Sequence, residues 1–428
     1  MKIALLLPNI SISGGVHVAL SHACALQIRG HEITLIDVSG TYGSNEIQVA
    51  GVALNVRSLG SVRDISFDLA ITTWWETIES IPFIKSKKAI NFIQSLEYRF
   101  YPENDFRARY AKLLQLIPTS SITVANWMVD PISSSIGPFQ CEVVLNGLSQ
   151  AFLPTKASPN SVGTSDEPLR VLVEGPANLE FKGVKQATEI LNNLDFPMDA
   201  TYVNTSGIEP DFDTAIYKNV FTSMSQADFS EVLEENDVLL KLSTVEGMFG
   251  PPLEAFSRGC TVVCYPVTGH DEYIVNRKNA LVAGLGNADE VTAHLKSLNN
   301  DRGLLETLQR GGIETAGSWI SMDDSSRNFV NVVENLYDST NSGEEISNLI
   351  RVIAPFRSEL QEMCELINAK NDEIWEVKTK IGVLENLANE YMNLYEMKKH
   401  DATLKGTIER VLRALRLKPK RTSHNLEL

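Results

Sequence analysis

The sequence has no long hydrophobic run and few cysteines. No stretch of the 428 residues approaches the roughly 18 consecutive apolar residues that a transmembrane helix needs. The apolar start, MKIALLLPN, breaks at Pro8, which makes it too short for a secretion signal. The 5 cysteines are odd in number and scattered, so they predict neither a disulfide framework nor a four-ligand zinc site. These absences favour a cytoplasmic protein.

The chain also lacks an excess of basic residues. It has 38 lysines and arginines against 54 acidic residues, for a formal net charge of −16. Because phosphate backbones repel such a chain, general nucleic-acid binding is not expected. The composition, with 43% hydrophobic and 21% charged residues, is that of a globular protein, and the length predicts two domains with a further segment.

Short apolar runs alternate with amphipathic, helix-length stretches over residues 1–152 and again over 169–338. The runs include KIALLLP, EITLIDV, DLAITTW, RVLVEG and DVLLKLS. Runs that are apolar on both faces are typical of parallel strands covered by helices. Residues 153–168, with 3 prolines and few apolar side chains, predict a linker. We therefore predict two α/β domains, with ligand-binding loops after the strands, in a cleft between the domains.

The first predicted strand leads into the loop NISISGGVHVAL. Gly14 and Gly15 stand where a helix begins, so backbone N–H groups and the helix dipole can receive a phosphate there. The pair is not a complete G-x-G-x-x-G fingerprint, and a tight strand-to-helix turn explains it equally well. His17 lies one turn into the helix, where a packing role is more common than a catalytic one.

The strongest signal is STVEGMFGPPLEAFSRG, residues 243–259. This stretch begins where the apolar run DVLLKLS ends. Pro251 and Pro252 predict the start of a helix, and Gly259 predicts its end. Glu246 then lies in the loop after the strand, and Glu254 lies about one turn into the helix.

Between the two glutamates, four backbone N–H groups are placed to converge on an anion. They belong to Gly247, Met248, Phe249 and Gly250. A carboxylate suits vicinal hydroxyls, and a cradle of N–H groups suits a diphosphate. The pattern therefore indicates a ligand with sugar hydroxyls at both ends of a diphosphate, which describes a nucleotide sugar. The alternative is that both glutamates are solvated or only cap the helix.

The same stretch resembles the E-x7-E motif of the family 4 retaining glycosyltransferases. The similarity covers residues 1 to about 337 and includes SGGVHVALSHACALQIRGHEITLI, VVLNGL, the Lys182–Gly183 pair and TGHDEYIVNRKNALVA. It implies an α/β fold of two Rossmann-like domains in the GT-B arrangement, an N-terminal acceptor domain and a C-terminal donor domain. The segment FIQSLEYRFYP also resembles polysaccharide-building members of the family, some of which transfer rhamnose.

The resemblance assigns roles to the donor-site residues. Glu246 would contact hydroxyls of the donor sugar and Glu254 those of the ribose, while Gly15 and the backbone of residues 247–250 would approach the phosphates. Lys182 would neutralise the diphosphate. In this family the acceptor is thought to attack the face of the sugar from which the diphosphate leaves, with a leaving-group oxygen accepting the acceptor hydroxyl's proton, so neither a protein nucleophile nor a cofactor is implied.

One position departs from the family pattern. Many members carry an arginine six residues before the lysine, and here that residue is Pro176, which supplies neither charge nor an N–H donor. Arg258, Arg277 or an arginine of the first domain are candidates to replace it. Alternatively, catalysis is weakened, and the chain is a binding subunit that recruits an active partner.

A metal ion is not expected, although the sequence has a D-x-D pattern. Asp211 and Asp213 would bind a divalent metal in a different glycosyltransferase fold. Here they lie in a loop far in sequence from the E-x7-E motif, so a metal role is the weaker alternative.

The candidates for an acceptor cleft lie in the first domain. They are His17, Trp74, Glu97, Tyr98 and Arg99. Trp74 ends a predicted strand and offers a surface on which a sugar can stack. Packing in the core is the alternative, because large aromatic side chains at strand ends are often buried.

The pattern changes from residue 343. Apolar residues recur at three- and four-residue steps over 343–400, which predicts a coiled coil and a homo-oligomer. The alternative is a helix folded back on its own domain. Residues 404–421 combine an apolar face with 7 basic residues and 1 acidic residue, which suits the anionic inner face of a plasma membrane or another assembly enzyme.

These observations predict a metal-independent hexosyltransferase-type glycosyltransferase. It would move sugar from a nucleotide donor to a growing, lipid-linked bacterial surface polysaccharide, such as an O-antigen or a capsule, at the cytoplasmic membrane surface. The alternative is an inactive GT-B scaffold that recruits a partner transferase through its coiled coil.

Overall fold

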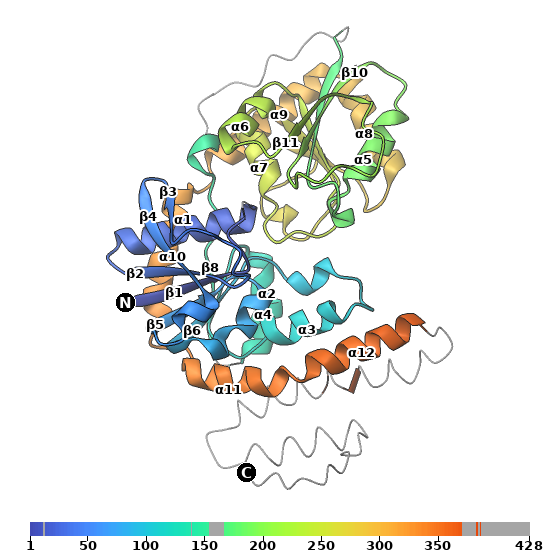
Figure 1. Cartoon of the computed structure of the whole chain (residues 1–428). Helices are drawn as coiled ribbons and strands as arrows, with labels where there is room; N and C mark the ends of the chain where they lie inside the picture. The colour runs from blue at the N-terminus through green and yellow to red at the C-terminus, as the bar shows by residue number, and fades with distance from the viewer. Residues whose placement is uncertain (12, 138, 154–166, 370–381, 384–385, 387–428) are drawn as a thin grey trace. The chain divides into compact units, whose positions relative to one another are not determined.

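The chain forms two compact α/β units in the computed structural model (Figure 1). The structure describes residues 1–11, 13–137, 139–153, 167–369, 382–383 and 386. Unit 1 comprises Met1–Thr123, Met128–Glu142 and the chain from Val332 onward. Unit 2 comprises Val124–Trp127 and Val143–Asn331.

Unit 1 contains a sheet in the order β3-β4-β2-β1-β5-β6-β7-β8. Its strands are β1 (Lys2–Leu7), β2 (Glu32–Asp37), β3 (Glu46–Val49), β4 (Val52–Ser58), β5 (Ser66–Thr72), β6 (Lys85–Ile93), β7 (Ser121–Thr123) and β8 (Cys141–Val143). The pairs from β4 to β7 are parallel, and β3 runs antiparallel to β4 at the edge. The central strands are buried on both faces, as the apolar runs predict.

Helices join the strands of unit 1 and complete its core. They are α1 (Gly14–Ile28), α2 (Trp75–Glu79), α3 (Phe106–Gln115), α4 (Val129–Ile136), α11 (Gly343–Ile353) and α12 (Phe356–Ala369). Helix α10 (Met322–Leu336) carries the chain from the sequence of unit 2 back into unit 1.

Unit 2 contains a wholly parallel sheet in the order β11-β10-β9-β12-β13-β14. Its strands are β9 (Leu169–Glu174), β10 (Met198–Asn204), β11 (Tyr217–Thr222), β12 (Val238–Lys241), β13 (Thr261–Cys264) and β14 (Ala280–Val282). Its helices are α5 (Val184–Asn192), α6 (Gln226–Glu234), α7 (Gly250–Ser257), α8 (Ala288–Asn300) and α9 (Arg302–Gly317).

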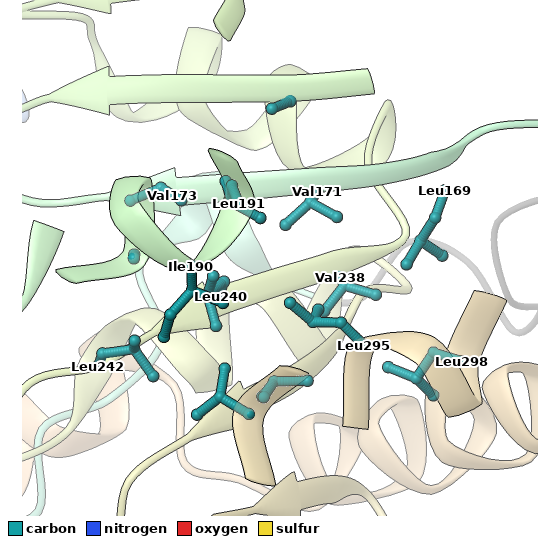
Figure 2. Packing of buried hydrophobic residues seen from close by; sticks show 14 of the residues in the cluster. Leu169, Val171, Val173, Ile190, Leu191, Val238, Leu240, Leu242, Leu295 and Leu298 are labelled. Atoms are coloured by element: carbon teal, nitrogen blue, oxygen red, sulfur yellow. The ribbon is translucent and has the colours of Figure 1, made fainter. Parts of the chain in front are cut away.

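The core of unit 2 is centred on its two middle strands. Figure 2 shows aliphatic side chains of β9 and β12 gathered with those of α5 and α8. Val171 and Val238 face each other in register and are fully buried. Burial of large aliphatic side chains stabilises each of them by about 1.5–3 kcal/mol. The loops that leave the carboxyl ends of β9 and β12 are therefore attached to the buried centre of the unit.

The unit boundaries differ from those predicted from sequence. The apolar runs placed one boundary near residue 152 and the other near 338, whereas the first part of unit 1 ends at Glu142 and unit 1 resumes at Val332. The difference arises because Phe152 is buried in the core of unit 2, where it packs edge-on against Phe229. Of the predicted linker, residues 154–166 lie outside the described residues.

The first part of the predicted coiled coil packs on unit 1. Ile346, Leu349, Ile350 and Leu360 are buried in one cluster with core residues of the first sheet and its helices. Over residues 343–366, this is the arrangement of a helix folded back on its own domain, and it replaces the coiled-coil interpretation there. Most of the predicted coiled coil beyond Ala369, and the basic helix 404–421, lie outside the described residues. Among the described helices, none is long and apolar enough to span a membrane.

Candidate functional site

The candidate site lies at the carboxyl ends of β9 and β12. These two strands are neighbours, and Val173 lies opposite Leu240. The next residues, Glu174 and Lys241, therefore leave the sheet side by side. Parallel strands bring their exit loops to one edge, where α/β proteins bind ligands. The loop after β9 carries Lys182, and the loop after β12 carries Glu246.

Lys182 and Glu246 form a close ion pair. The Lys182 ammonium donates to both carboxylate oxygens of Glu246, at 2.9 and 2.8 Å. Burial favours a higher pKa for the Glu246 carboxyl, but the charges of Lys182 and Lys241 outweigh it and lower that pKa overall. Burial likewise opposes the charge on Lys182, yet Glu246 raises the pKa of its ammonium. Both side chains are thus charged at neutral pH.

Gly183 explains how Lys182 is positioned. Its φ of +69° lies in the left-handed region, and a Cβ there would come within 2.2 Å of the Leu242 carbonyl oxygen. Only glycine lets the loop after β9 lie so close to the exit of β12. The contact is reinforced by the Thr244 N–H, which donates to the Phe181 carbonyl at 2.8 Å.

The loop 247–250 enters helix α7 as the sequence predicts. Pro251 and Pro252 occupy the first turn of α7. The Gly250 N–H donates to the Met248 carbonyl at 3.0 Å, so this donor of the predicted cradle is already used inside the loop. Among the described residues, the N–H groups of Gly247, Met248 and Phe249 donate no hydrogen bond. The available cradle therefore has three donors rather than four.

Side chains from elsewhere in unit 2 hold this loop. Trp127 donates from its indole Nε1 to the Gly247 carbonyl at 2.8 Å. Glu272 accepts from the Trp127 N–H at 2.9 Å, and the Tyr273 hydroxyl donates to the Phe249 carbonyl. With its carbonyl groups engaged in this way, the loop is fixed before any ligand arrives.

The carboxyl group of Glu254 differs from that of Glu246 in its partners and its charge. Among the described residues, its carboxyl has neither an ion-pair partner nor a hydrogen-bond donor. The residue is partly accessible by surface area, but burial of its carboxyl raises the pKa to about 8, the Glu174 charge adds to this shift, and Lys241 opposes it. The Glu254 carboxyl is therefore mostly protonated at neutral pH and can donate as well as accept a hydrogen bond.

The raised pKa of Glu254 predicts a pH-dependent stability effect. The Glu254 carboxyl of the folded protein keeps its proton up to about pH 8, whereas in the unfolded chain it loses the proton near its ordinary pKa of 4.5. The stability that this group supplies is therefore complete below pH 4.5 and is lost as the pH rises through 8. Glu254→Gln should gain stability relative to wild type over this range, by at most about 5 kcal/mol. Because the Glu254 side chain is partly exposed to solvent, the gain in stability should be smaller than this upper limit.

Melting temperatures of both proteins at pH 5, 7 and 9 measure the effect. Glu231→Gln, which changes an exposed glutamate of α6, is the matched control and should follow wild type at each pH. A constant difference between Glu254→Gln and wild type would show that Glu254 does not titrate in this range.

Sequence reasoning missed a second buried pair, Lys241 and Glu174. The Lys241 ammonium donates to Oε2 of Glu174 at 2.6 Å and to the Glu174 backbone carbonyl at 2.9 Å. The side chain of Lys241 is only 1% exposed. The available signal was one lysine in the otherwise apolar run DVLLKLS, because a lysine in a buried strand needs a buried partner.

The structure also bears on the replacements considered for the arginine absent at position 176. Arg258 is buried and is engaged by Glu234 and the Ala151 carbonyl. Arg277 is exposed in a turn with a φ of +64°. Lys241, in contrast, lies at the edge from which the site loops leave.

The phosphate-binding candidates of unit 1 lie at a helix start. Gly14 and Gly15 are the first residues of α1, and the Ser13 side chain accepts from the Val16 N–H at 3.3 Å. His17 is partly buried, and desolvation lowers the pKa of its imidazole. Gly15 lies beside the Gln94 side chain, whose Oε1 is 3.2 Å from the position of a Cβ.

The acceptor-cleft candidates of unit 1 have structural partners. Trp74 stacks on Phe100 with ring centroids 6.0 Å apart. Glu97 is 1% exposed and accepts from the Trp75 N–H at 2.7 Å, which satisfies the first turn of α2. Burial raises the pKa of its carboxyl well above the usual range. Tyr98 is half-buried, with the Lys112 ammonium 5.7 Å from its ring centroid.

These contacts fit the packing alternative for Trp74 and Glu97, whereas Arg99 is exposed.

The D-x-D pattern forms a turn. The Asp213 carboxylate accepts from the Ala215 N–H at 2.9 Å, and both aspartates are exposed. The described residues contain no group of three or more His, Cys, Asp or Glu side chains placed to hold a metal ion.

The fold is that of the GT-B glycosyltransferases, which contain two parallel-sheet α/β domains. Residues 216–315, which include Glu246 and Glu254, match the family model of the glycosyl transferases group 1. No curated protein shows significant sequence similarity to the chain.

Solved structures support the fold at low sequence identity. Sucrose-phosphate synthase from Thermosynechococcus elongatus aligns with a TM-score of 0.63 and 12% identity, over 79% of this chain and 99% of its own. HepE from Anabaena, in complex with UDP and glucose, aligns with a TM-score of 0.60 and 13% identity, over 78% and 100%. WaaG, a glycosyltransferase involved in lipopolysaccharide biosynthesis, aligns with a TM-score of 0.60 and 13% identity, over 77% and 99%.

Proposed function

We propose that the protein is a nucleotide-sugar-dependent glycosyltransferase and that unit 2 binds the donor. The observation that carries the proposal is the Lys182–Glu246 pair, with ammonium-to-carboxylate distances of 2.8 and 2.9 Å, beside the N–H cradle of residues 247–249. One fixed cation and several N–H donors suit the charge that grows on a departing diphosphate. The family match over residues 216–315 and the UDP complex of HepE support the same ligand class.

Each residue then has a distinct task. Glu246 accepts from hydroxyls of the donor sugar, and Lys182 neutralises the diphosphate. Glu254 exchanges hydrogen bonds with the ribose hydroxyls. The acceptor hydroxyl attacks the face of the sugar that the diphosphate leaves, and a leaving-group oxygen takes the hydroxyl's proton, so transfer proceeds with retention and without a protein nucleophile. The acceptor is a growing, lipid-linked surface polysaccharide, a proposal in keeping with the lipopolysaccharide role of WaaG.

The donor assignment predicts different effects for substitutions of the two glutamates. Glu254→Ala should weaken nucleoside diphosphate binding about tenfold, since a lost hydrogen bond costs on the order of 1.5 kcal/mol. Glu246→Ala should retain that binding and reduce turnover, because the free nucleotide lacks the sugar that Glu246 contacts. Calorimetric titration with UDP, ADP, GDP and dTDP, and a donor-hydrolysis assay, measure the two effects. Equal effects of both substitutions in folded protein would reject the assignment.

A second candidate is a GT-B scaffold that does not catalyse transfer. Pro176 favours it, because the loop after β9 then offers one cation, Lys182, and Glu246 already neutralises that cation. A wild-type protein that binds a nucleoside diphosphate but neither transfers nor hydrolyses any sugar of the donor panel would establish this alternative.

A further inference from the structure

The N–H cradle after β12 depends on how its peptide groups are turned. A trans peptide group is planar, so the carbonyl of one residue and the N–H of the next point in opposite directions. The described part of the chain contains no cis peptide bond. A donor that holds the Gly247 carbonyl therefore also fixes the direction of the Met248 N–H, which belongs to the same peptide group. The direction of each cradle N–H can thus be traced to the partner of the preceding carbonyl.

The carbonyl groups of residues 246–249 all accept a hydrogen bond. Their donors are, in chain order, the Thr268 hydroxyl at 3.4 Å, the Trp127 indole N–H at 2.8 Å, the Gly250 N–H at 3.0 Å and the Tyr273 hydroxyl. Side chains outside the loop supply three of these donors, so the surrounding structure sets the direction of the peptide groups.

Trp127 makes the short side-chain bond to a peptide group whose N–H is available. Tyr273 holds a peptide group whose N–H, that of Gly250, is already used inside the loop. The Thr268 bond, at 3.4 Å, is longer than an ordinary hydroxyl hydrogen bond. The Trp127 bond holds the peptide group of Met248, whose N–H donates to no described residue. Trp127 therefore controls an N–H that a ligand can use.

Trp127 is itself fixed in place. It lies in Val124–Trp127, a segment that belongs to unit 2. Glu272 accepts from the Trp127 N–H and from the Asn126 side-chain amide, each at 2.9 Å. The indole ring lies against Gly269, where a Cβ would come within 2.4 Å of the ring. The indole donor is therefore presented to the loop from a defined position.

We propose that Trp127 is a positioning residue for anion binding, because its bond to the Gly247 carbonyl turns the Met248 N–H away from the indole and toward the anion. This inference rests on the proposed function, in which the anion is the diphosphate of the donor. Trp127 acts through the peptide group rather than on the ligand. An anion that binds the Met248 N–H polarises the peptide group, which strengthens the indole bond in return.

Trp127→Phe tests the inference. Phenylalanine keeps an aromatic ring at this position but removes the indole donor, so the peptide group of Met248 is released. We expect the affinity for inorganic pyrophosphate to fall about three- to tenfold, the usual effect of one hydrogen bond. The affinity for whichever of UDP, ADP, GDP and dTDP the wild-type protein binds should fall by a similar factor. Titrations of both proteins measure these affinities.

Trp319 offers a matched control in the same unit. Its indole N–H also donates to a backbone carbonyl, that of Asn146, at 2.9 Å. Its ring packs edge-on against Tyr273, and phenylalanine keeps an aromatic ring there. Trp319→Phe should lower thermal stability about as much as Trp127→Phe but leave the pyrophosphate affinity unchanged. Equal losses of affinity in the two variants, or no loss in Trp127→Phe, would overturn the inference.

Nitrogen-15 NMR of the wild-type protein supplies a readout that a merely structural role would not move. The Trp127 indole signal should shift downfield as pyrophosphate is added, whereas the Trp319 indole signal should not move. A stationary Trp127 signal, at pyrophosphate concentrations that shift the Met248 amide signal, would contradict the inference. The signals are assigned through their bonded neighbours, so this measurement does not require a variant to fold.

Measurements on the free protein separate this inference from the proposed function. Without a ligand, Trp127→Phe should lower the order parameter of the Met248 amide from the value of a rigid backbone, about 0.85, and Trp319→Phe should not. If neither pyrophosphate nor any of the nucleotides binds the wild-type protein, the proposed function fails. A lower order parameter in Trp127→Phe would then leave the hold of Trp127 on the loop standing, and an unchanged one would overturn it as well.

Discussion

Truncation of the chain after Asp338 should unfold unit 1. The deletion removes α11 and α12, whose Ile346, Leu349, Ile350 and Leu360 are at most 5% exposed. With about 1.5–3 kcal/mol for each of four buried aliphatic side chains, the loss is roughly 6–12 kcal/mol. That range matches the whole stability of a typical domain, which is about 5–15 kcal/mol. We expect an insoluble or protease-sensitive protein in which only unit 2 retains cooperative unfolding.

Truncation after Ala369 is the matched control, because it keeps both helices. It removes Val383, a partly buried residue at the border of the same core, and should cost little stability. Thermal unfolding and limited proteolysis of the two truncated proteins measure the difference. If the protein that ends at Asp338 unfolds at the wild-type temperature, the packing of α11 and α12 contributes far less than their burial indicates.

Substitution of Lys182 should have the largest effect on catalysis. Under the proposed function, Lys182→Ala removes the cation nearest the departing diphosphate and should reduce transfer by about a hundredfold to a thousandfold, the usual effect of losing one electrostatic stabiliser in a catalytic site. The fold should survive, because Lys182 is partly exposed in a loop and Glu246 can take up a proton when its partner is lost. Initial rates of sugar transfer or donor hydrolysis measure the effect.

Lys185→Ala is the control for Lys182→Ala. Lys185 lies three residues further on, on the exposed face of α5, and its loss should leave the rate unchanged. EDTA should not reduce wild-type activity. An activity that EDTA removes and manganese restores would instead assign a metal role, with Asp211 and Asp213 as the first candidates for ligands. Wild-type rates in Lys182→Ala would remove Lys182 from the mechanism.

The fold could be predicted because its central strands are apolar on both faces. The runs KIALLLP and DVLLKLS coincide with β1 and β12, and Pro251, Pro252 and Gly259 bracket α7 as expected. The edge strand β11 (Tyr217–Thr222) gave no such signal. In β11, the segment YKNVFT is exposed at every residue after the first, so it lacks the apolar run that burial selects.

The candidate site could be predicted only in part. The positions of Glu246 and Glu254 follow from the strand, the loop and the helix in one short stretch of sequence. The charge state of Glu254 cannot be predicted in this way, because it depends on Glu174 and Lys241. These residues lie 80 and 13 residues before Glu254, and they meet only through the pairing of β9 with β12. Similarly, the apolar spacing of α11 shows that one face is buried but not whether the chain itself or a second copy covers it.

The discontinuity of unit 1 has a consequence for synthesis on the ribosome. Its sheet is complete in sequence by Val143, yet Ile346 and Leu360, which cover part of its core, are translated only after the whole of unit 2. At roughly 5–20 residues per second, the intervening stretch of about 200 residues takes on the order of 10–40 seconds. During that interval unit 2 can fold, while the nascent first unit presents the apolar face that α11 and α12 cover later. Slow codons or chaperone binding in this window should therefore affect the yield of unit 1 more than that of unit 2.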